Sequence, residues 1–158
     1  MLNKKFILCL ILLVNFIFLN AFSSDQINFD ISEIEILDSG NKIIGKKRGQ
    51  ITTNDGITIN ADQFEYDKIK NILKANGKIK IKDKTNNYEI TSENVEYYKD
   101  IEKIEIKGKT NSFIYLNYNF KTEDLTILRK EKIISSDKSA TIIDEKSQTL
   151  YEISKFSY

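Results

Sequence analysis

The sequence predicts an all-β fold built from repeated antiparallel strands. Apolar residues recur at every second position over stretches of four to seven residues, which is typical of strands with one buried face. Turn-forming residues separate these stretches, and beyond residue 25 no helical period is sustained over three turns. A similar pattern of strands then returns every 28 to 31 residues, which indicates a structural repeat.

The alternation places the expected strands in order along the chain. Asp55-Gly56 and Asn76-Gly77 are strong turn dipeptides, and we expect them to separate strands. The apolar positions of the successive strands are Ile57, Ile59 and Ala61; Phe64 and Tyr66; Ile79 and Ile81; Tyr88 and Ile90; Val95 and Tyr97; and Ile104 and Ile106.

The repeat has two markers besides the alternation. A small residue marks one edge of each unit, at Gly49, Gly77, Gly108 and Ser136. Upstream of it lies a strand with an acidic residue near its start, in ISEIEI (31–36), NADQFEY (60–66), TSENVEY (91–97) and KTEDLTI (121–127). No single unit can bury its apolar face alone, so we expect neighbouring units to stack and bury it together.

The N-terminus is typical of an export signal. Lys4 and Lys5 precede a run of 14 residues, Phe6 to Leu19, that is apolar except for Asn15. Ala21-Phe22-Ser23 then supplies small residues at the positions that a signal peptidase reads. The run is short for a membrane span, which needs about 20 residues, although an uncleaved anchor is the alternative. We expect a signal peptide over residues 1–24 and one domain over residues 25–158.

Composition argues against several function classes. The chain has no His, and its one Cys is Cys9 in the signal segment, so we expect no thiol nucleophile, disulfide or metal centre and no catalytic residues or cofactors. Without Lys4 and Lys5, 22 basic residues face 23 acidic ones. These charges are interspersed, which disfavours nucleic acid as a partner. Lys46-Lys47-Arg48 is interpreted as a solvated turn.

The acidic residues of the repeats invite a metal or catalytic interpretation. They are Glu33, Asp62, Glu93 and Glu123. Single carboxylates at the starts of strands are, however, typical turn-capping or solvated groups. We therefore interpret them as structural.

Two segments resemble a known family. ADQFEYD…LKANGKIKI (61–81) and SENVEYYKDIEKIEIKG (92–108) resemble the OstA-like domain of lipopolysaccharide transport, over roughly residues 27–157. This domain forms the periplasmic bridge protein and the N-terminal part of the outer-membrane lipopolysaccharide assembly protein. The resemblance implies an open, V-shaped β-jelly roll of two facing sheets with an apolar inside that is open along its length. It also implies a periplasmic location associated with the outer membrane, lipid A acyl chains as ligand, and joining to other OstA-like domains by edge-strand pairing.

Strand phase selects the residues of the inner face. Each of them is a candidate both for the core and for contact with lipid, and the sequence does not separate the two roles. These candidates are Ile59, Phe64, Tyr66, Ile79, Ile81, Ile90, Val95, Tyr97, Ile104, Ile106, Phe120, Leu125 and Ile127.

Several alternatives stay open at this point. TLYEISKFSY (149–158) resembles the opening of another unit, which fits either the partner-facing edge of a bridge protein or the front of a longer assembly protein. A membrane-anchored partner of the bridge would require residues 6–22 to remain as a span. A secreted structural β-solenoid with a dry core and no ligand is the rival from another class.

Overall fold

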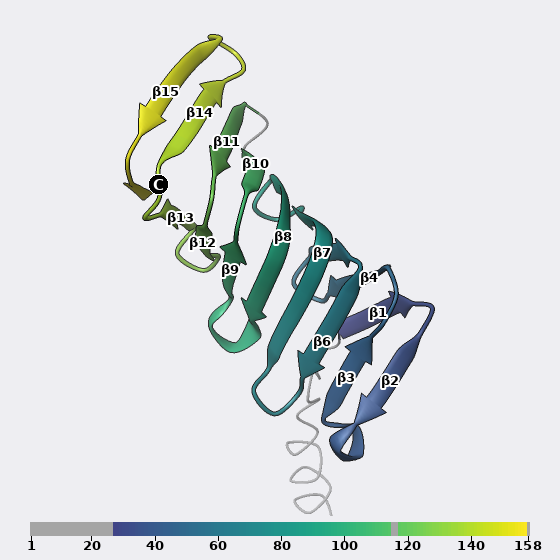
Figure 1. Cartoon of the computed structure of the whole chain (residues 1–158). Coiled ribbons are helices and arrows are strands. Elements are labelled where there is room, and N and C mark those ends of the chain that lie inside the picture. The colour runs from purple at the N-terminus through teal and green to yellow at the C-terminus, as the bar shows by residue number, and fades with distance from the viewer. Residues whose placement is uncertain (1–26, 115–116, 158) are drawn as a thin grey trace, which may run out of the picture.

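Sixteen strands and two single-turn 3-10 helices make up the part of the chain that the structure describes, residues 27–114 and 117–157 of a computed structural model (Figure 1). All of the strand pairs are antiparallel, which confirms the all-β prediction. The 3-10 helices are η1 (Asp38–Gly40) and η2 (Lys99–Ile101), which connect neighbouring strands.

The strands form two facing sheets that share two long strands, β7 (Ile72–Asp83) and β8 (Tyr88–Tyr98). The first sheet has the order β1-β4-β5-β7-β8-β10-β11-β14-β15. Its other strands are β1 (Ile27–Ile31), β4 (Gly49–Thr53), β5 (Ile57–Ala61), β10 (Thr110–Ile114), β11 (Tyr118–Thr122), β14 (Ala140–Asp144) and β15 (Thr149–Ile153).

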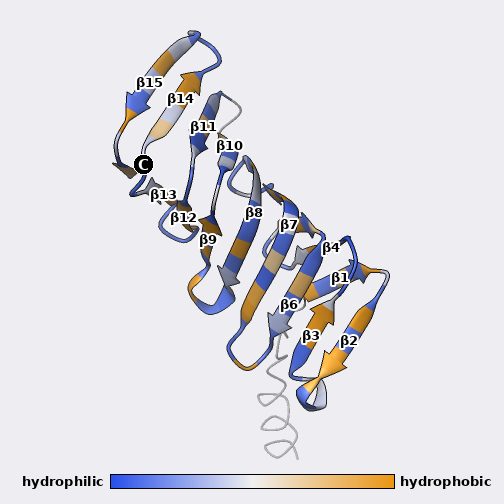
Figure 2. Ribbon diagram, viewed as in Figure 1, coloured by the Kyte–Doolittle hydropathy of each residue, from blue (hydrophilic) through white to orange (hydrophobic). Residues whose placement is uncertain are grey.

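The second sheet runs β2-β3-β6 up to β7, and continues from β8 as β9-β12-β13-β16. These strands are β2 (Ile34–Leu37), β3 (Lys42–Gly45), β6 (Gln63–Asp67), β9 (Lys103–Lys107), β12 (Leu125–Leu128), β13 (Ile133–Ser136) and β16 (Phe156–Ser157). Along most strands, apolar and polar residues alternate, as the coloured bands in Figure 2 show, and the buried apolar residues line the space between the sheets. The predicted open jelly roll is therefore the observed architecture.

The bend between the sheets, here called the crease, is sharpest in β7. The pairing of β7 with β8 shifts register between Asn76 and Ile79, and Gly77 and Lys78 both have positive φ. A Cβ on Gly77 would lie 2.8 Å from Oδ2 of Asp62, so any other residue there would require Asp62 to shift. The prediction that Asn76-Gly77 ends a strand is wrong, because this dipeptide makes a bulge that bends one continuous strand.

The small residues that mark the repeat all lie along this crease. Gly49 begins β4, Gly108 lies between β9 and β10, and Ser136 ends β13. At each of these points the chain passes from the second sheet to the first. Each repeat unit seen in the sequence therefore crosses the crease once in this direction, at its small residue, and crosses back between strands such as β5 and β6 or β11 and β12.

The repeated acids bind neighbouring groups at the same crease, as their structural interpretation requires. Asp62 accepts a hydrogen bond from Arg48 at 2.8 Å, and Glu33 pairs with Lys47 at 3.1 Å. In the fourth unit the capping carboxylate belongs to Asp124, which accepts the backbone N–H of Gly108 at 3.0 Å. The sequence pattern had assigned that role to its neighbour, Glu123.

Both ends of the roll present strand edges. β1 and β2 lie at the N-terminal end, and β15 and β16 lie at the other end. Among the described strands, each of the four pairs with a neighbour on one side only. The roll is therefore not closed at its ends, and its outer strands offer free backbone groups.

The predicted signal peptide, residues 1–24, lies outside the described residues, and so does Tyr158. Within residues 27–114 and 117–157, no helix has the length and apolar character that a membrane crossing requires.

Candidate functional site

The inner face of the roll contains every residue that strand phase selected. All thirteen are buried, with the least buried, Tyr66, only 8 % exposed. The period-two assignment of strand faces is thus confirmed across both sheets. Contact of these residues with lipid stays a prediction, because burial alone does not distinguish a core residue from one that lines a slot.

The centre of the interior is filled by its own side chains. Ile57, Ile59, Ile81 and Ile90 are 0 % exposed, so no space as large as a water molecule touches them. This is the close packing of an ordinary protein core. The expectation of an apolar inside that is open along its whole length is therefore not met in this stretch, where the two sheets close on each other.

The C-terminal end of the interior is different, because a cavity of about 350 Å³ remains there. It lies between the last strands of both sheets and reaches the unpaired end of the roll. The Phe120 and Phe156 rings lie 5.5 Å apart at its wall. The cavity is lined by Ile114, Tyr118, Phe120, Ile142, Tyr151 and Phe156, with Asp144 and Ser157 as its polar residues.

Of the thirteen predicted residues, only Phe120 lines this cavity. For two other residues that line the cavity, Ile114 and Ile142, the sequence nevertheless contained a signal. Ile114 follows buried Ser112 in phase, and Ile142 follows buried Ala140 in the same way. Ile142 also lies directly opposite Phe120 in the register of β11 and β14. The partner of Phe120 at the wall, Phe156, belongs to a two-residue strand too short to show any period.

Apolar side chains also gather on the two outer edges. β2 exposes Ile34, Ile36 and Leu37, and β15 exposes Leu150 and Tyr151. These side chains lie beside free backbone N–H and C=O groups. An added strand could therefore gain both hydrogen bonds and buried apolar area at either end.

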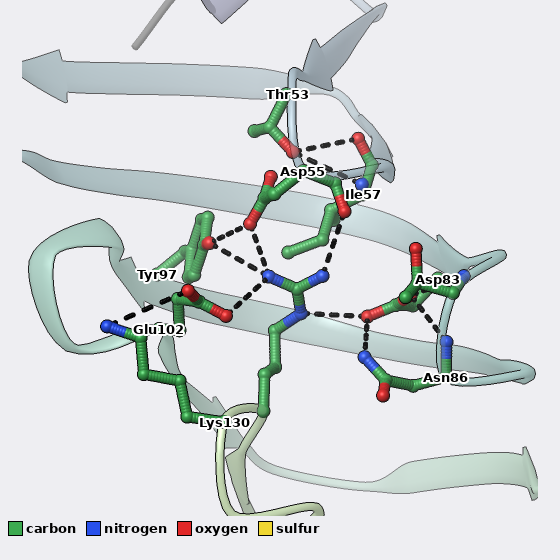
Figure 3. A network of polar contacts seen from close by, with 10 residues as sticks. Thr53, Asp55, Ile57, Asp83, Asn86, Tyr97, Glu102 and Lys130 are labelled. Atoms are coloured by element: carbon green, nitrogen blue, oxygen red, sulfur yellow. Dashed lines mark hydrogen bonds and ion pairs between the residues drawn. The ribbon is translucent and has the colours of Figure 1, made fainter.

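Figure 3 shows a polar cluster that connects the first sheet with the turn after β12. Arg129, whose side chain is 3 % exposed, follows β12 and extends to the first sheet. Its Nε donates to Oδ2 of Asp83 at 2.8 Å, and its guanidinium also donates to the carboxylate of Asp55 and to the Asp55 carbonyl. Asp83 ends β7, and Asp55 lies in the turn between β4 and β5.

Further groups satisfy the cluster from three sides. The hydroxyl of Tyr97 donates to Asp55 at 2.6 Å, and Glu102 lies 3.4 Å from the guanidinium of Arg129. Asn86 donates to Asp83 from its side chain and from its backbone, each at 2.9 Å. The cluster therefore joins four segments that are distant in sequence.

Burial and pairing act in opposite directions on the pKa values of this cluster. Burial raises the pKa of Asp83, but hydrogen bonds from Asn86 and Arg129 outweigh it and hold that pKa below its ordinary value. The pKa of Asp55 is likewise lowered, because hydrogen bonds and the Arg129 charge overcome its burial. Burial lowers the pKa of Arg129, yet its carboxylate partners raise it overall. Both carboxylates are therefore charged at neutral pH.

The sequence analysis did not select this cluster, although Arg129 and Asp83 both occupy inward positions of the strand alternation. Arg129 continues the inward positions of Leu125 and Ile127, and Asp83 continues those of Ile79 and Ile81. Charged residues in an inward phase are unusual, because burying a charge is costly unless it is paired. A charged residue at an inward position was therefore the feature of the sequence that could have indicated the cluster.

The outer side of the crease carries many charged residues, and most of those named here form ion pairs. Each residue of the basic run is paired, Lys46 with Glu35, Lys47 with Glu33 and Arg48 with Asp62, as expected for a solvated turn. A cavity of about 610 Å³ nearby is bordered by Lys78, Lys80, Glu93, Lys109 and Lys121 among others. In the part of the chain that is described, no three His, Cys, Asp or Glu side chains are placed to hold a metal ion.

The fold resembles a solved structure. It matches the crystal structure of LptH, described as the LptA homologous periplasmic component of the conserved lipopolysaccharide transport device from Pseudomonas aeruginosa, with a TM-score of 0.64. The two chains are 8% identical, and the match covers 82% of this chain and 94% of LptH. No protein-family model and no curated protein matches the sequence. At this identity the likeness shows that the chain has the fold of LptH.

Proposed function

We propose that this protein is a periplasmic module of lipopolysaccharide transport. In this proposal it is exported through its signal peptide, binds lipid A acyl chains in its apolar interior, and passes them toward the outer membrane. It joins partner OstA-like domains by pairing of edge strands, performs no catalysis and needs no cofactor. The observation that carries the proposal is the apolar cavity at the unpaired C-terminal end of a roll with the fold of LptH.

The chemistry of this end suits an acyl chain better than other ligands. Six of the eight lining residues are aliphatic or aromatic, and burying each methylene of a ligand is worth about 0.8 kcal/mol. The cavity is continuous with strands β15 and β16, which have a free edge. A chain bound there could therefore continue into the interior of a second domain added at the same edge.

The filled centre of the interior favours one competing function, a secreted structural solenoid without ligand. A dry, close-packed stack is what such a protein requires. The apolar cavity between the last described strands favours the transport module instead, because a close-packed stack leaves no such space. The two functions differ in a single measurable property, contact with lipid.

Site-specific photocrosslinking in cells that make lipopolysaccharide tests the proposal. A photoreactive amino acid would replace Phe120, Ile142 or Phe156. The outward controls are two exposed residues, Lys121 on β11 and Glu152 on β15. We expect lipopolysaccharide adducts at the cavity positions only. An exported and folded protein without adducts at any of them would establish the structural solenoid.

Edge pairing requires a separate experiment. The photoreactive group would be placed at Ile36 on β2 or Tyr151 on β15, with Glu65 on the interior strand β6 as control. Joining by strand addition predicts protein–protein adducts at the two edges and none at Glu65. Adducts that form equally at Glu65 would rule out an edge-specific contact.

A further inference from the structure

We propose that Arg129, Asp55 and Asp83 form a clasp, an ionic lock that closes the open side of the roll over its filled centre. Resting on the proposed function, the inference adds that acyl chains bind in the C-terminal cavity while the clasp is closed, and enter the centre only when it opens.

The position of the three residues in the strands supports a clasp across the open side. β7 begins in the second sheet at Ile72, bends at the crease, and ends in the first sheet at Asp83. Asp83 and the Asp55 turn therefore lie at the rim of the first sheet that is farthest from the crease. Arg129 lies at the equivalent rim of the second sheet, in the turn between β12 and β13. The hydrogen bonds of Arg129 to both acids join the two rims.

The same contacts make the clasp a barrier to widening of the interior. The side chain of Asp83 is 0 % exposed, that of Arg129 is 3 % exposed and that of Asp55 is 29 % exposed, so the ion pairs are largely shielded from water. An acyl chain offers no hydrogen bonds to replace those it would displace, and an unpaired buried charge is strongly unfavourable. The apolar core is one continuous cluster from Ile59 in the centre to Phe120, and a cavity borders it at the C-terminal end.

Other features would allow the clasp to open. All three residues lie in turns or at a strand end, so they can separate without breaking the pairing of a sheet. Oδ1 of Asp55 is buried and finds no hydrogen-bond partner among the described residues. Opening would return this oxygen and the charged groups to water, which offsets part of the lost pairing.

The distance between the rims tests the clasp without any ligand. Spin labels would be attached to cysteines at Lys84 and Glu131, which are exposed in the two facing turns, in a Cys9→Ser background. The test variant is the triple substitution Arg129→Met, Asp55→Asn and Asp83→Asn, which removes all three charges together and leaves none unpaired. We expect a single narrow distance in the parent protein and a longer, broader distribution in the triple variant.

Two further variants keep this test decisive. Lys42→Met with Glu65→Gln removes an ion pair of 2.8 Å on the outer face, and should leave the distance unchanged. Arg129→Lys keeps the charge but lacks the planar, five-donor guanidinium that spans Asp55 and Asp83, and should give an intermediate distribution. An unchanged distance in both the triple variant and Arg129→Lys would overturn the clasp.

The ligand part is tested with a twelve-carbon fatty acid carrying a diazirine, with the capture sites mapped by mass spectrometry. In the parent protein we expect capture at β11, β14 and β16 and none at Ile59 or Ile81, whereas the triple variant should extend capture to those two residues. Capture at Ile59 in the parent protein, with the label distance narrow, would overturn the barrier. Capture nowhere would refute the proposed function together with the ligand part, while the label distances still decide the clasp.

Discussion

The centre and the C-terminal end of this roll are built from the same strand pattern but differ in packing. In the centre, Ile57, Ile59 and Ile81 are completely buried and a charged cluster joins the sheets. At the C-terminal end, Ile142 and Phe156 are only partly buried and border a cavity of about 350 Å³. An alternating inner face therefore does not by itself make a slot. We propose that the contacts that hold the two sheets together decide whether one remains.

The largest expected effect comes from breaking the cluster at one residue. Arg129→Met should lower the free energy of unfolding by about 3–5 kcal/mol, because it leaves two carboxylates buried without their partner. Urea denaturation measures this loss. The other arginine provides the control, since Arg48 forms an exposed pair with Asp62 and Arg48→Met should cost at most about 1 kcal/mol. Equal losses in the two variants would mean that the centre is not held by Arg129.

Truncation of an isoleucine should destabilise the protein more in the centre than at the C-terminal end. Ile59→Ala, in the filled centre, should cost about 2–5 kcal/mol, because it leaves a cavity in a close-packed core. Ile142→Ala, at the wall of the C-terminal cavity, should cost less than about 1.5 kcal/mol, because that side chain is only partly buried. Ile142→Ala should in turn weaken lipopolysaccharide binding, and Ile59→Ala should not. A larger stability loss for Ile142→Ala would contradict the comparison.

The crease provides a smaller test of how the sheets are brought together. Gly77 and Gly108 both have positive φ, so alanine at either position should cost about 1–2 kcal/mol in backbone strain. At Gly77 the new Cβ would also meet Asp62, whereas nothing lies within 4 Å at Gly108. Gly77→Ala should therefore be the more damaging substitution in thermal unfolding, and Asp62→Ala should relieve part of its cost. Indistinguishable melting temperatures would refute the close approach at the crease.

The smallest expected effect is the loss of stability at acidic pH. Asp55 and Asp83 have lowered pKa values in the folded protein, so the stability they contribute is complete above their ordinary pKa and is lost as the pH falls below about 4. Arg129 stays charged throughout this range, and buried Tyr88 and Tyr97 stay neutral because burial raises their pKa.

Other groups also titrate in acid, so the measurement has to be a difference. Glu102 borders the cluster, with Lys130 at 3.8 Å from it, and several exposed carboxylates are paired elsewhere. The stability of the parent protein should therefore fall more steeply below pH 4 than that of the triple variant with Arg129→Met, Asp55→Asn and Asp83→Asn. Parallel pH profiles for the two proteins would show that these carboxylates do not stabilise the fold through their charge.

Much of the fold could be predicted because the alternation of apolar and polar residues assigns each strand residue to a face from local sequence alone. Ile59, Val95 and Ile106 were assigned to the inner face from period two alone, and all are buried. The bend at Gly77 was misassigned because a turn dipeptide inside a strand and one between two strands have the same local sequence. Only the long pairing of β7 with β8 on both sides of it, Ile72 to Asn76 and Ile79 to Asp83, makes it a bulge.

The candidate site could be predicted only in part. The end-to-end difference in packing depends on contacts between the sheets, such as Arg129 with Asp55, which are 74 residues apart in sequence. Arg129 and Asp83 are in phase with inward positions, but strand phase cannot tell which inward charges meet. The cavity wall likewise depends on Phe156 packing against Phe120, which no local pattern specifies.

We expect the C-terminal cavity to take the acyl chains while the clasp keeps the centre filled. Methyl NMR of isoleucine-labelled protein, with and without purified lipopolysaccharide, distinguishes the two regions because isoleucines lie in both. The signals of Ile114 and Ile142 should shift on addition of lipopolysaccharide, while those of Ile57, Ile59 and Ile81 should stay in place. Shifts confined to the central isoleucines, or no shift in either region, would contradict this expectation.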